Sequence, residues 1–386
     1  MPRTTHKKTT AARFDSYAPS LPSPLADART ARRERDASDV AGLSRAQLRE
    51  LYRFLFETRR LEEHLVALYR QGKVVGGVYR SLGQEATAVG CAYALHDGDL
   101  LQPLIRDLGA MLVHGAMPLA FFRQYLARAT GPTGGRDLNA HFSDPSRGLL
   151  GPISMLGAMV PVAAGFLLAS RLRGEMRAAL AFIGDGGSST GAFYEGVSFA
   201  VVQKLPLVVV IEANHYAYST PTSEQLPGGD LVTRARGFGC HVVRLDGNDV
   251  LACYEATRDA RARALGGEGP QLLVAETYRR RGHAEHDDQR YVPEGESASW
   301  EADNDPLTRY EDFLIRGEHL ATDDLEAVQR EVAGELTAAR EQAVSEPFPD
   351  AASQRRGVFA DDESPIPPST TWYRGGPTHR PQGAGV

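Results

Sequence analysis

Residues 181–220 narrow the possible folds more than any other stretch, because they predict a strand, a glycine-rich turn, a helix and a second strand in succession. The first strand is uniformly apolar, as a strand covered on both faces requires, and the glycines around Asp185 end it abruptly. Pro206 then separates a helical pattern from a second apolar strand, residues 207–211, which leads to Asn214. This segment is a βαβ unit, and it predicts an α/β fold with a mainly parallel sheet flanked by helices.

Polar side chains follow both strands of this unit. Parallel neighbours end at the same edge of a sheet, so Asp185 and Asn214 are expected side by side where open α/β sheets bind ligands. A carboxylate, an amide oxygen and backbone carbonyls are hard ligands that suit Mg²⁺, which completes its shell with phosphate oxygens and water. Gly186 and Gly187 let the backbone approach a ligand closely. The pattern predicts a metal that holds a diphosphate, although Gly-Asp-Gly alone is more often a simple turn.

The longer motif, GDGxxxxGxFxEGxxFAxxxxLPxVVVxExNxxAxSTP, resembles the alpha subunit of the decarboxylating first component of 2-oxo acid dehydrogenase complexes. The resemblance implies a thiamine diphosphate-binding fold with thiamine diphosphate and Mg²⁺ as cofactors. It implies that Asp185, Asn214 and the Tyr216 carbonyl coordinate the metal, beside Gly186 and Gly187. The family motif ends in two asparagines, and this chain has Ala213 at the first of them.

Two further motifs fit the same family. SLGQEA contains Gln84 and Glu85, which could be helix-start residues or active-site residues with equal weight. The family's Tyr-Arg-x-His-Gly segment keeps Arg106, which the resemblance implies as a diphosphate ligand because a guanidinium fork suits phosphate oxygens. Ile105 and Leu108 replace the tyrosine and the histidine, so Leu108 is expected to remove a polar group from the cofactor mouth.

A long loop, residues 130–157, is rich in Gly, Pro, Ser and Asp, and long loops on such folds usually carry function. Its Arg136, Asn139 and His141 resemble the family's GRDxNxHF signature. Ser154 and Leu156 stand where branched-chain relatives have Ser-x-Leu against the aminopyrimidine side of the cofactor, so both are candidate cofactor contacts.

A second charged loop, RRRGHAEHDDQRYVP, follows the last predicted strand. By composition it is a solvated charge cluster, or a metal site through His283, His286, Asp287 and Asp288. The resemblance instead implies that His283 lies beside the diphosphate and the reacting centre. An imidazole that can be charged or neutral near pH 7 could stabilise an anion or move a proton during acyl transfer, so His283 is the candidate catalytic residue.

Composition and charge limit the kinds of partner that the protein is expected to bind and the compartment in which it is expected to lie. A net charge of −6 gives no electrostatic reason to expect nucleic-acid binding. No apolar run approaches the length of a membrane span, and no apolar segment follows the basic N-terminus as a secretory signal requires. Three widely spaced cysteines favour neither a disulfide framework nor a zinc site. These features predict a cytoplasmic protein with no nucleic-acid or membrane partner.

The remaining chain predicts one main domain, residues 41–345, between a flexible arm, residues 1–40, and a C-terminal extension, residues 346–386. The apolar spacing after Ser44 predicts a long amphipathic helix. AMVPVAAGFLLASRLRG predicts a buried helix before the strand that ends at Asp185, with Met155 and Met159 as core residues. The segments GCHVVRLDGND and PQLLVAETYRR predict further strands, with a helix over residues 250–264 between them.

The resemblance implies oxidative decarboxylation of a small-molecule 2-oxo acid, followed by transfer of the acyl group to the lipoyl arm of an acyltransferase core. It also implies a beta subunit that completes the site in an α2β2 assembly. Ser154 and Leu156 favour a branched-chain substrate such as 2-oxoisovalerate, and hence branched-chain amino acid catabolism, with pyruvate and acetoin as alternatives. A non-catalytic cofactor-binding scaffold subunit is the alternative from another class.

Overall fold

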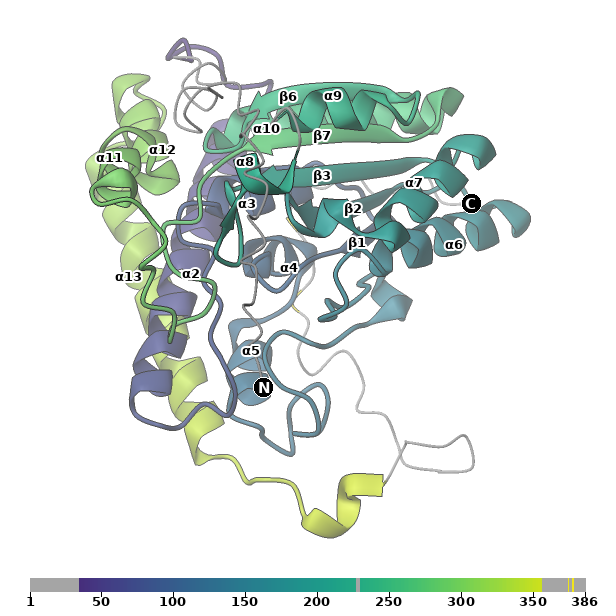
Figure 1. The fold of residues 1–386 in the computed structure, drawn as a ribbon. Coiled ribbons are helices and arrows are strands. Elements are labelled where there is room, and N and C mark those ends of the chain that lie inside the picture. Colours follow the sequence, from purple (N-terminus) through teal and green to yellow (C-terminus); the bar gives the residue numbers. More distant parts are fainter. Residues whose placement is uncertain (1–34, 227–229, 356–373, 375–376, 378–386) are drawn as a thin grey trace, which may run out of the picture.

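The computed structural model describes residues 35–226 and 230–355, together with Arg374 and Pro377. Its centre is a five-stranded parallel sheet in the order β1-β2-β3-β7-β6 (Figure 1). The strands are β1 (Leu100–Gln102), β2 (Ala179–Gly184), β3 (Leu207–Ala213), β6 (His241–Asp246) and β7 (Gln271–Glu276), and a separate two-stranded hairpin is formed by β4 (Tyr216–Ala217) and β5 (Thr220–Pro221). The parallel sheet predicted from the sequence is confirmed.

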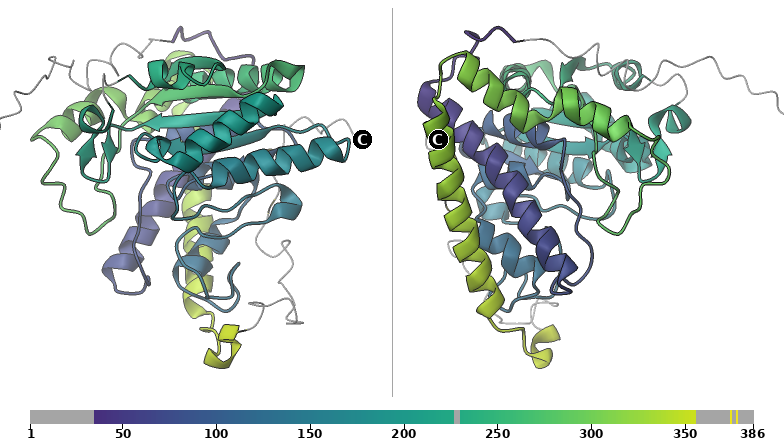
Figure 2. Two further views of the ribbon diagram at one scale, coloured as in Figure 1. Left: turned by 45° about the vertical axis from the view of Figure 1, so that its right-hand side comes forward. Right: turned by 90° about the vertical axis from the view of Figure 1, so that its left-hand side faces the viewer.

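Helices cover both faces of the sheet. The described helices are α2 (Arg45–Arg70), α3 (Glu85–Tyr93), α4 (Leu108–His114), α5 (Pro118–Tyr125), α6 (Met159–Leu172), α7 (Gly191–Gln203), α8 (Thr222–Gln225), α9 (Leu231–Arg236), α10 (Val250–Arg263), α11 (Glu296–Asn304), α12 (Pro306–Arg316) and α13 (Thr322–Ser345). α3, α4 and α10 lie on one face, and α6, α7 and α9 lie on the other (Figure 2). The long helices α2 and α13 pack side by side outside the first group.

The sheet divides the apolar core into two layers. Leu180 and Phe182 of β2 point into the layer with α3, α4 and α10, whereas Ala181 and Ile183 point into the layer with α6 and α7. This alternation follows from the period of two along a strand, and burial on both faces explains why these strands read as unbroken apolar runs. The sequence pattern therefore placed the central strands correctly.

The structure contains the long helices predicted from the sequence, but one of them, α6, is less buried than expected. α2 begins with the predicted capping box, in which Ser44 and Gln47 bond each other's backbone amides. The prediction that residues 158–174 form a buried helix is wrong in part, because α6 buries only one side and leaves its Leu172 side chain 80% exposed. Met155 is also no core residue, since it is 65% exposed. A helix that is apolar all round can cover a sheet on one side and present an apolar surface on the other, and periodicity alone does not separate these cases.

Several short elements, among them β1, α5, α11 and the β4–β5 hairpin, were not predicted. β1 has three residues and joins the edge of the sheet beside β2, and α11 precedes the proline that starts α12. Along the described chain, no helix is both long and apolar enough to cross a membrane.

Both predicted terminal segments contribute contacts to the main domain where the structure describes them. Residues 1–34 of the predicted arm lie outside the described residues, but Arg35 forms ion pairs with Asp249 and Glu255. In the C-terminal extension, Arg374 donates two hydrogen bonds, of 3.0 and 2.6 Å, to the fully buried carboxylate of Glu57 in α2. The extension thus supplies a countercharge to the core.

We expect Arg374→Leu to lower the free energy of unfolding by about 2–3 kcal/mol, because Glu57 would keep a buried charge without this partner. This expected loss of stability is smaller than the loss on breaking a fully buried ion pair, because the Arg374 side chain is 27% exposed. Urea unfolding measures the change, with Arg330→Leu as the control for an arginine in an exposed ion pair with Glu326. Equal effects of the two substitutions would contradict the importance of the Glu57 contact.

Candidate active site

A pocket of about 440 Å³ opens at the carboxyl edge of β2 and β3. Every site residue predicted from the sequence lines it, namely Arg106, Ser154, Leu156, Asp185, Gly186, Gly187, Asn214, Tyr216 and His283. These residues come from five separate segments of the chain, which the parallel sheet and its loops bring to one place. The structure therefore supports their grouping, and their individual roles remain predictions.

Asp185 is buried at the floor of this pocket, directly after β2. Its Oδ1 accepts a 2.7 Å hydrogen bond from the Gly186 amide, and its Oδ2 accepts a 2.5 Å bond from the Thr222 hydroxyl. Burial raises the pKa of Asp185 despite these bonds, so a cation beside it would stabilise the charged form. Glycine is required at 186, because a Cβ there would lie 2.4 Å from the Ala217 Cβ.

Asn214 and Tyr216 follow β3, the neighbour of β2, and both line the same pocket. The Asn214 Oδ1 accepts a 3.4 Å hydrogen bond from the Tyr216 amide. The Tyr216 carbonyl accepts a 3.4 Å bond from the Arg279 guanidinium and keeps a second lone pair. A buried carboxylate, an amide oxygen and a backbone carbonyl in one pocket form the oxygen donor set that Mg²⁺ prefers, so the residues present fit this metal.

Two arginines make one side of the pocket cationic. Arg106 and Arg279 both line it, and the Arg106 Nε is buried without a hydrogen-bond partner among the described residues. Burial and the nearby Arg279 lower the pKa of Arg106 to about 10. An anion would relieve both the desolvation and the repulsion between the guanidinium groups. This side of the pocket consequently fits phosphate oxygens.

His283 lies between Arg106 and two tyrosine rings. Its Nδ1 is 3.3 Å from an Arg106 Nη, and the same guanidinium donates to the His283 carbonyl. The ring centroids of His283 and Tyr218 are 4.5 Å apart. Burial, together with Arg106 and Arg279, lowers the pKa of His283 to about 4. The imidazole is therefore neutral near pH 7, which favours proton movement over the cationic role that the sequence left open.

The loop that carries His283 is folded by its own charges. Arg279 and Arg280 are buried, so the interpretation of a solvated charge cluster is wrong for them. Asp287 accepts hydrogen bonds of 2.6 Å from both the His283 amide and the Tyr291 hydroxyl, which fix the loop. Among the described residues, this loop contains no group of three side chains placed to hold a metal ion.

Other sequence motifs divide between the pocket and the core. Asn139 and His141 of the long loop line the pocket, whereas the Arg136 side chain donates to the Thr133 carbonyl. Ser154 and Leu156 lie exposed at the pocket mouth. Leu108, expected at the cofactor mouth, is instead buried in the core at the first turn of α4. Its replacement of a histidine therefore changes the core beside the site.

Sequence reasoning missed several residues that line the pocket. Glu212, Tyr79 and Tyr218 were not singled out, and Arg279 was treated only as part of a charged loop. The signal for Glu212 was available, because it stands two residues before Asn214 and alternate strand residues share a face. Tyr79 and Tyr218 gave no such signal, since the packing of distant loops brings them to the pocket.

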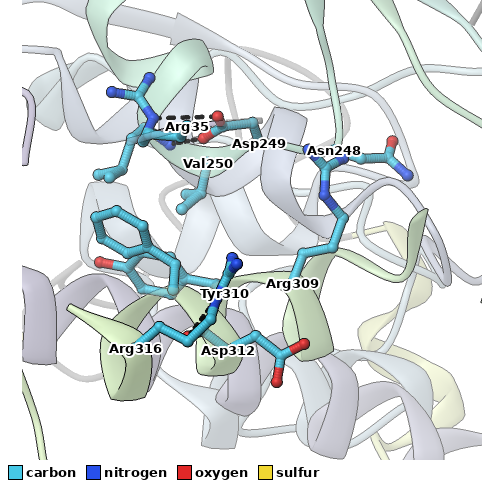
Figure 3. A pocket seen from close by; sticks show the side chains of 10 residues that line it. Arg35, Asn248, Asp249, Val250, Arg309, Tyr310, Asp312 and Arg316 are labelled. Carbon is cyan, nitrogen blue, oxygen red and sulfur yellow. Dashed lines mark hydrogen bonds and ion pairs between the residues drawn. The ribbon is translucent and has the colours of Figure 1, made fainter. Parts of the chain in front are cut away.

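A second pocket, of about 380 Å³, lies near the start of α10 (Figure 3). Three arginines line it, but Arg35 pairs with Asp249 and Arg309 pairs with Asp246. The Arg316 Nε donates to the Asp312 carbonyl. Its cations are thus largely committed to neighbouring oxygen atoms, in contrast to Arg106 in the first pocket.

His215, which stands between Asn214 and Tyr216 in the sequence, allows a prediction of how the stability of the protein depends on pH. Burial lowers its pKa to about 4, so the unfolded chain binds more protons between about pH 6.5 and 4. The contribution of neutral His215 to the free energy of unfolding is complete above about pH 6.5 and is lost as the pH falls from about 6.5 to about 4. Between these pH values, we expect the free energy of unfolding of the wild type to fall by on the order of 3 kcal/mol more than that of His215→Asn. Asparagine suits the φ of +72° at this position.

Urea unfolding of the cofactor-free chain at several pH values provides this comparison. The difference between the two curves isolates His215 from other buried groups, such as Glu62, whose pKa is raised to about 8 by burial and which therefore titrates in both proteins. Parallel curves would contradict a neutral, buried His215.

Comparisons with known proteins agree with this geometry. The model of the family described as the dehydrogenase E1 component matches residues 55–352. The chain is 39% identical over 282 residues to the pyruvate dehydrogenase E1 component subunit alpha of Staphylococcus aureus, covering 71% of this chain and 72% of that protein. It is 33% identical over 320 residues to the alpha subunit of acetoin:2,6-dichlorophenolindophenol oxidoreductase of Cupriavidus necator, covering 83% and 96%. It is also 33% identical over 321 residues to the 2-oxoisovalerate dehydrogenase subunit alpha of Bacillus subtilis, covering 83% and 97%.

Proposed function

Because this chain belongs to the dehydrogenase E1 component family, as an alpha subunit of a 2-oxo acid dehydrogenase, we propose that its substrate is a branched-chain 2-oxo acid such as 2-oxoisovalerate. Members of the family use thiamine diphosphate with a divalent metal such as Mg²⁺. The observation that carries the cofactor part of this proposal is the pocket that Asp185, Asn214, Tyr216 and Arg106 line together.

In this proposal Asp185, Asn214 and the Tyr216 carbonyl hold Mg²⁺, and Arg106 binds the diphosphate. Gly186 and Gly187 allow close approach of the backbone, and Ser154 and Leu156 contact the aminopyrimidine side. Thiamine diphosphate, when bound, would supply a nucleophilic carbon for the 2-oxo group and a thiazolium ring able to take up the electron pair that decarboxylation leaves. The protein's contribution is to orient this group, balance its charge and exclude water.

His283 is the proposed catalytic residue for acyl transfer to the lipoyl partner. Acyl transfer to a lipoyl disulfide breaks its S–S bond and leaves one sulfur as a thiolate. The neutral imidazole could accept the proton lost by the hydroxyl that becomes the acyl carbonyl and deliver it to this thiolate, while the adjacent Arg106 would stay with the diphosphate. The main-chain carbonyl of His283 also accepts a hydrogen bond from Arg106, and this bond does not depend on the imidazole. Substitution of the side chain therefore leaves one anchor of Arg106 in place.

We expect His283→Ala to reduce overall complex activity about 100-fold or more, and decarboxylation with an artificial electron acceptor much less, because proton transfer contributes about 10²–10⁴-fold. Comparing the two assays separates acyl transfer from cofactor use. His286→Ala, in the same loop but outside the pocket lining, is the matched control. Equal losses in both assays for His283→Ala would contradict a specific role in acyl transfer.

The branched-chain assignment is supported by Ser154 and Leu156 at the pocket mouth and by the relative that acts on 2-oxoisovalerate. Pyruvate and acetoin are the other candidates, since relatives named for them have similar identity. Comparing kcat/KM for 2-oxoisovalerate, pyruvate and acetoin in the reconstituted enzyme tests the assignment. The proposal requires the highest value for 2-oxoisovalerate, and a higher value for pyruvate or acetoin would overturn it.

The proposed partners are a beta subunit in an α2β2 heterotetramer and a lipoyl acyltransferase core. The relatives support this in part, because they are named as alpha subunits. Free Cys91, Cys240 and Cys253 suit a reducing compartment, and we place the protein in the cytoplasm. A scaffold subunit without catalytic function is less favoured, because Asp185, Asn214 and the candidate catalytic residue His283 are all retained and line one pocket.

A further inference from the structure

Gln84 connects the proposed metal ligand Asn214 to the buried carboxylate of Glu212, which lines the same pocket. It stands at the position before α3, where its side chain caps no helix amide, and it is 1% exposed. Its Nε2 donates a 3.1 Å hydrogen bond to Glu212 Oε1, and its Oε1 accepts a 3.0 Å bond from Asn214 Nδ2. All three side chains are buried, so each of these bonds is protected from exchange with water.

The chemistry of these groups gives the chain of bonds a direction. A carboxylate oxygen accepts hydrogen bonds, so the Gln84 amide must turn its nitrogen towards Glu212. Its oxygen then faces Asn214, which must in turn present its own nitrogen to Gln84. Asn214 lines the pocket and Gln84 does not, so the Asn214 Oδ1 is left for the pocket side. An inverted Asn214 amide would offer hydrogens where a metal requires an oxygen.

The neighbouring Glu85 has a different environment. It pairs with Arg59 at 2.8 Å and accepts a 2.9 Å hydrogen bond from the Gly83 amide, contacts that hold the turn before α3. The two candidate residues of the SLGQEA motif therefore have different contacts. Glu85 holds the backbone of the turn, whereas Gln84 contacts residues that line the pocket.

We propose that Gln84 is a positioning residue that fixes the amide of Asn214, with Glu212 as its anchor, so that Asn214 Oδ1 is held ready for the divalent metal. This inference rests on the proposed metal site and adds the residues that orient one of its ligands. Groups that orient metal ligands typically change metal affinity by about 10- to 100-fold when they are removed.

The test is the affinity of the reconstituted alpha and beta enzyme for Mn²⁺ in the presence of thiamine diphosphate, measured by electron paramagnetic resonance of the free ion. Gln84→Met keeps the length of the side chain and removes both hydrogen bonds. We expect it to weaken Mn²⁺ binding about 10- to 100-fold. Gln271→Met is the matched control, because Gln271 is equally buried and hydrogen-bonded but lies at the opposite end of β7.

A charge-conserving exchange supplies the rescue. In Gln84→Glu combined with Glu212→Gln, the carboxylate at 84 accepts hydrogen bonds from both Asn214 Nδ2 and the new amide at 212. The orientation of Asn214 is thereby retained, and we expect Mn²⁺ affinity within about threefold of wild type. Gln84→Glu alone has the same shape as wild type but places two carboxylates together, so a loss of affinity in this single variant that Glu212→Gln restores separates hydrogen bonding from packing.

Three results would overturn the proposal. Wild-type affinity in Gln84→Met is the first, and a folded double variant that binds Mn²⁺ as weakly as Gln84→Met is the second. The third is that the wild-type enzyme shows no Mn²⁺ binding that depends on thiamine diphosphate. That result would rule out the proposed metal site itself. The first two leave that site intact, so failure of the positioning role and failure of the proposed function are distinguishable.

Discussion

Asp185→Asn is expected to weaken magnesium-dependent binding of thiamine diphosphate by more than about 100-fold while leaving a folded chain. The substitution removes the anionic ligand proposed for the metal, and even residues that only orient a metal ligand contribute about 10- to 100-fold. The amide oxygen introduced at position 185 can still accept the hydrogen bond from the Gly186 amide, and the new amide nitrogen can donate to the oxygen of the Thr222 hydroxyl, which donates to Asp185 in the wild type. Asp185→Ala should be at least as severe.

Calorimetric titration with thiamine diphosphate, with and without Mg²⁺, measures this loss. Asp246→Asn is the matched control, because Asp246 is a buried carboxylate at the end of β6, outside the pocket, where it pairs with Arg309. Thermal unfolding establishes that each variant is folded. Unchanged cofactor affinity in Asp185→Asn, beside measurable binding by wild type, would refute the metal assignment.

The second large effect concerns the partner subunit: the chain alone is expected to release no carbon dioxide from 2-oxo acids, and addition of the beta subunit should restore turnover. The pocket mouth carries exposed apolar side chains, Met155 and Leu156, which an isolated chain leaves in water. Further exposed apolar side chains lie on α6 and α7, which pack against each other, namely Val162, Phe166, Leu172, Tyr194, Phe199 and Val202. Exposed apolar side chains gathered on neighbouring elements are typical of interaction sites.

Carbon dioxide release by the purified chain, before and after addition of the beta subunit, measures this dependence. Leu172→Glu, at an exposed position on α6 away from the pocket lining, should weaken assembly without changing cofactor contacts within the chain. Turnover by a monodisperse single-chain preparation would contradict the requirement for a second subunit.

The sequence predicted the centre of the fold because that part depends on local patterns. The strands around Asp185 and Asn214 are continuous apolar runs ended by glycine or polar residues, and their parallel pairing follows from the connecting helix. The grouping of the site residues could be predicted for the same reason, with the family resemblance adding Arg106 and His283 from distant segments.

The remaining features depend on packing between distant elements, which local patterns do not contain. The sequence of α6 is apolar all round, so it could not show that Leu172 faces outwards. The neutral state of His283 results from burial beside Arg106, and its own residue type allows either charge. The role of Gln84 required its contact with Asn214, 130 residues away in the chain.

The most direct test of the metal site is an anomalous difference map at the manganese absorption edge, from crystals of the alpha and beta enzyme grown with Mn²⁺ and thiamine diphosphate. We expect a peak within coordination distance, about 2.0–2.3 Å, of the Asp185 carboxylate, the Asn214 Oδ1 and the Tyr216 carbonyl. We also expect diphosphate oxygens between this peak and Arg106. A manganese peak elsewhere in the chain, or a diphosphate bound away from these residues, would rule out the proposed metal site.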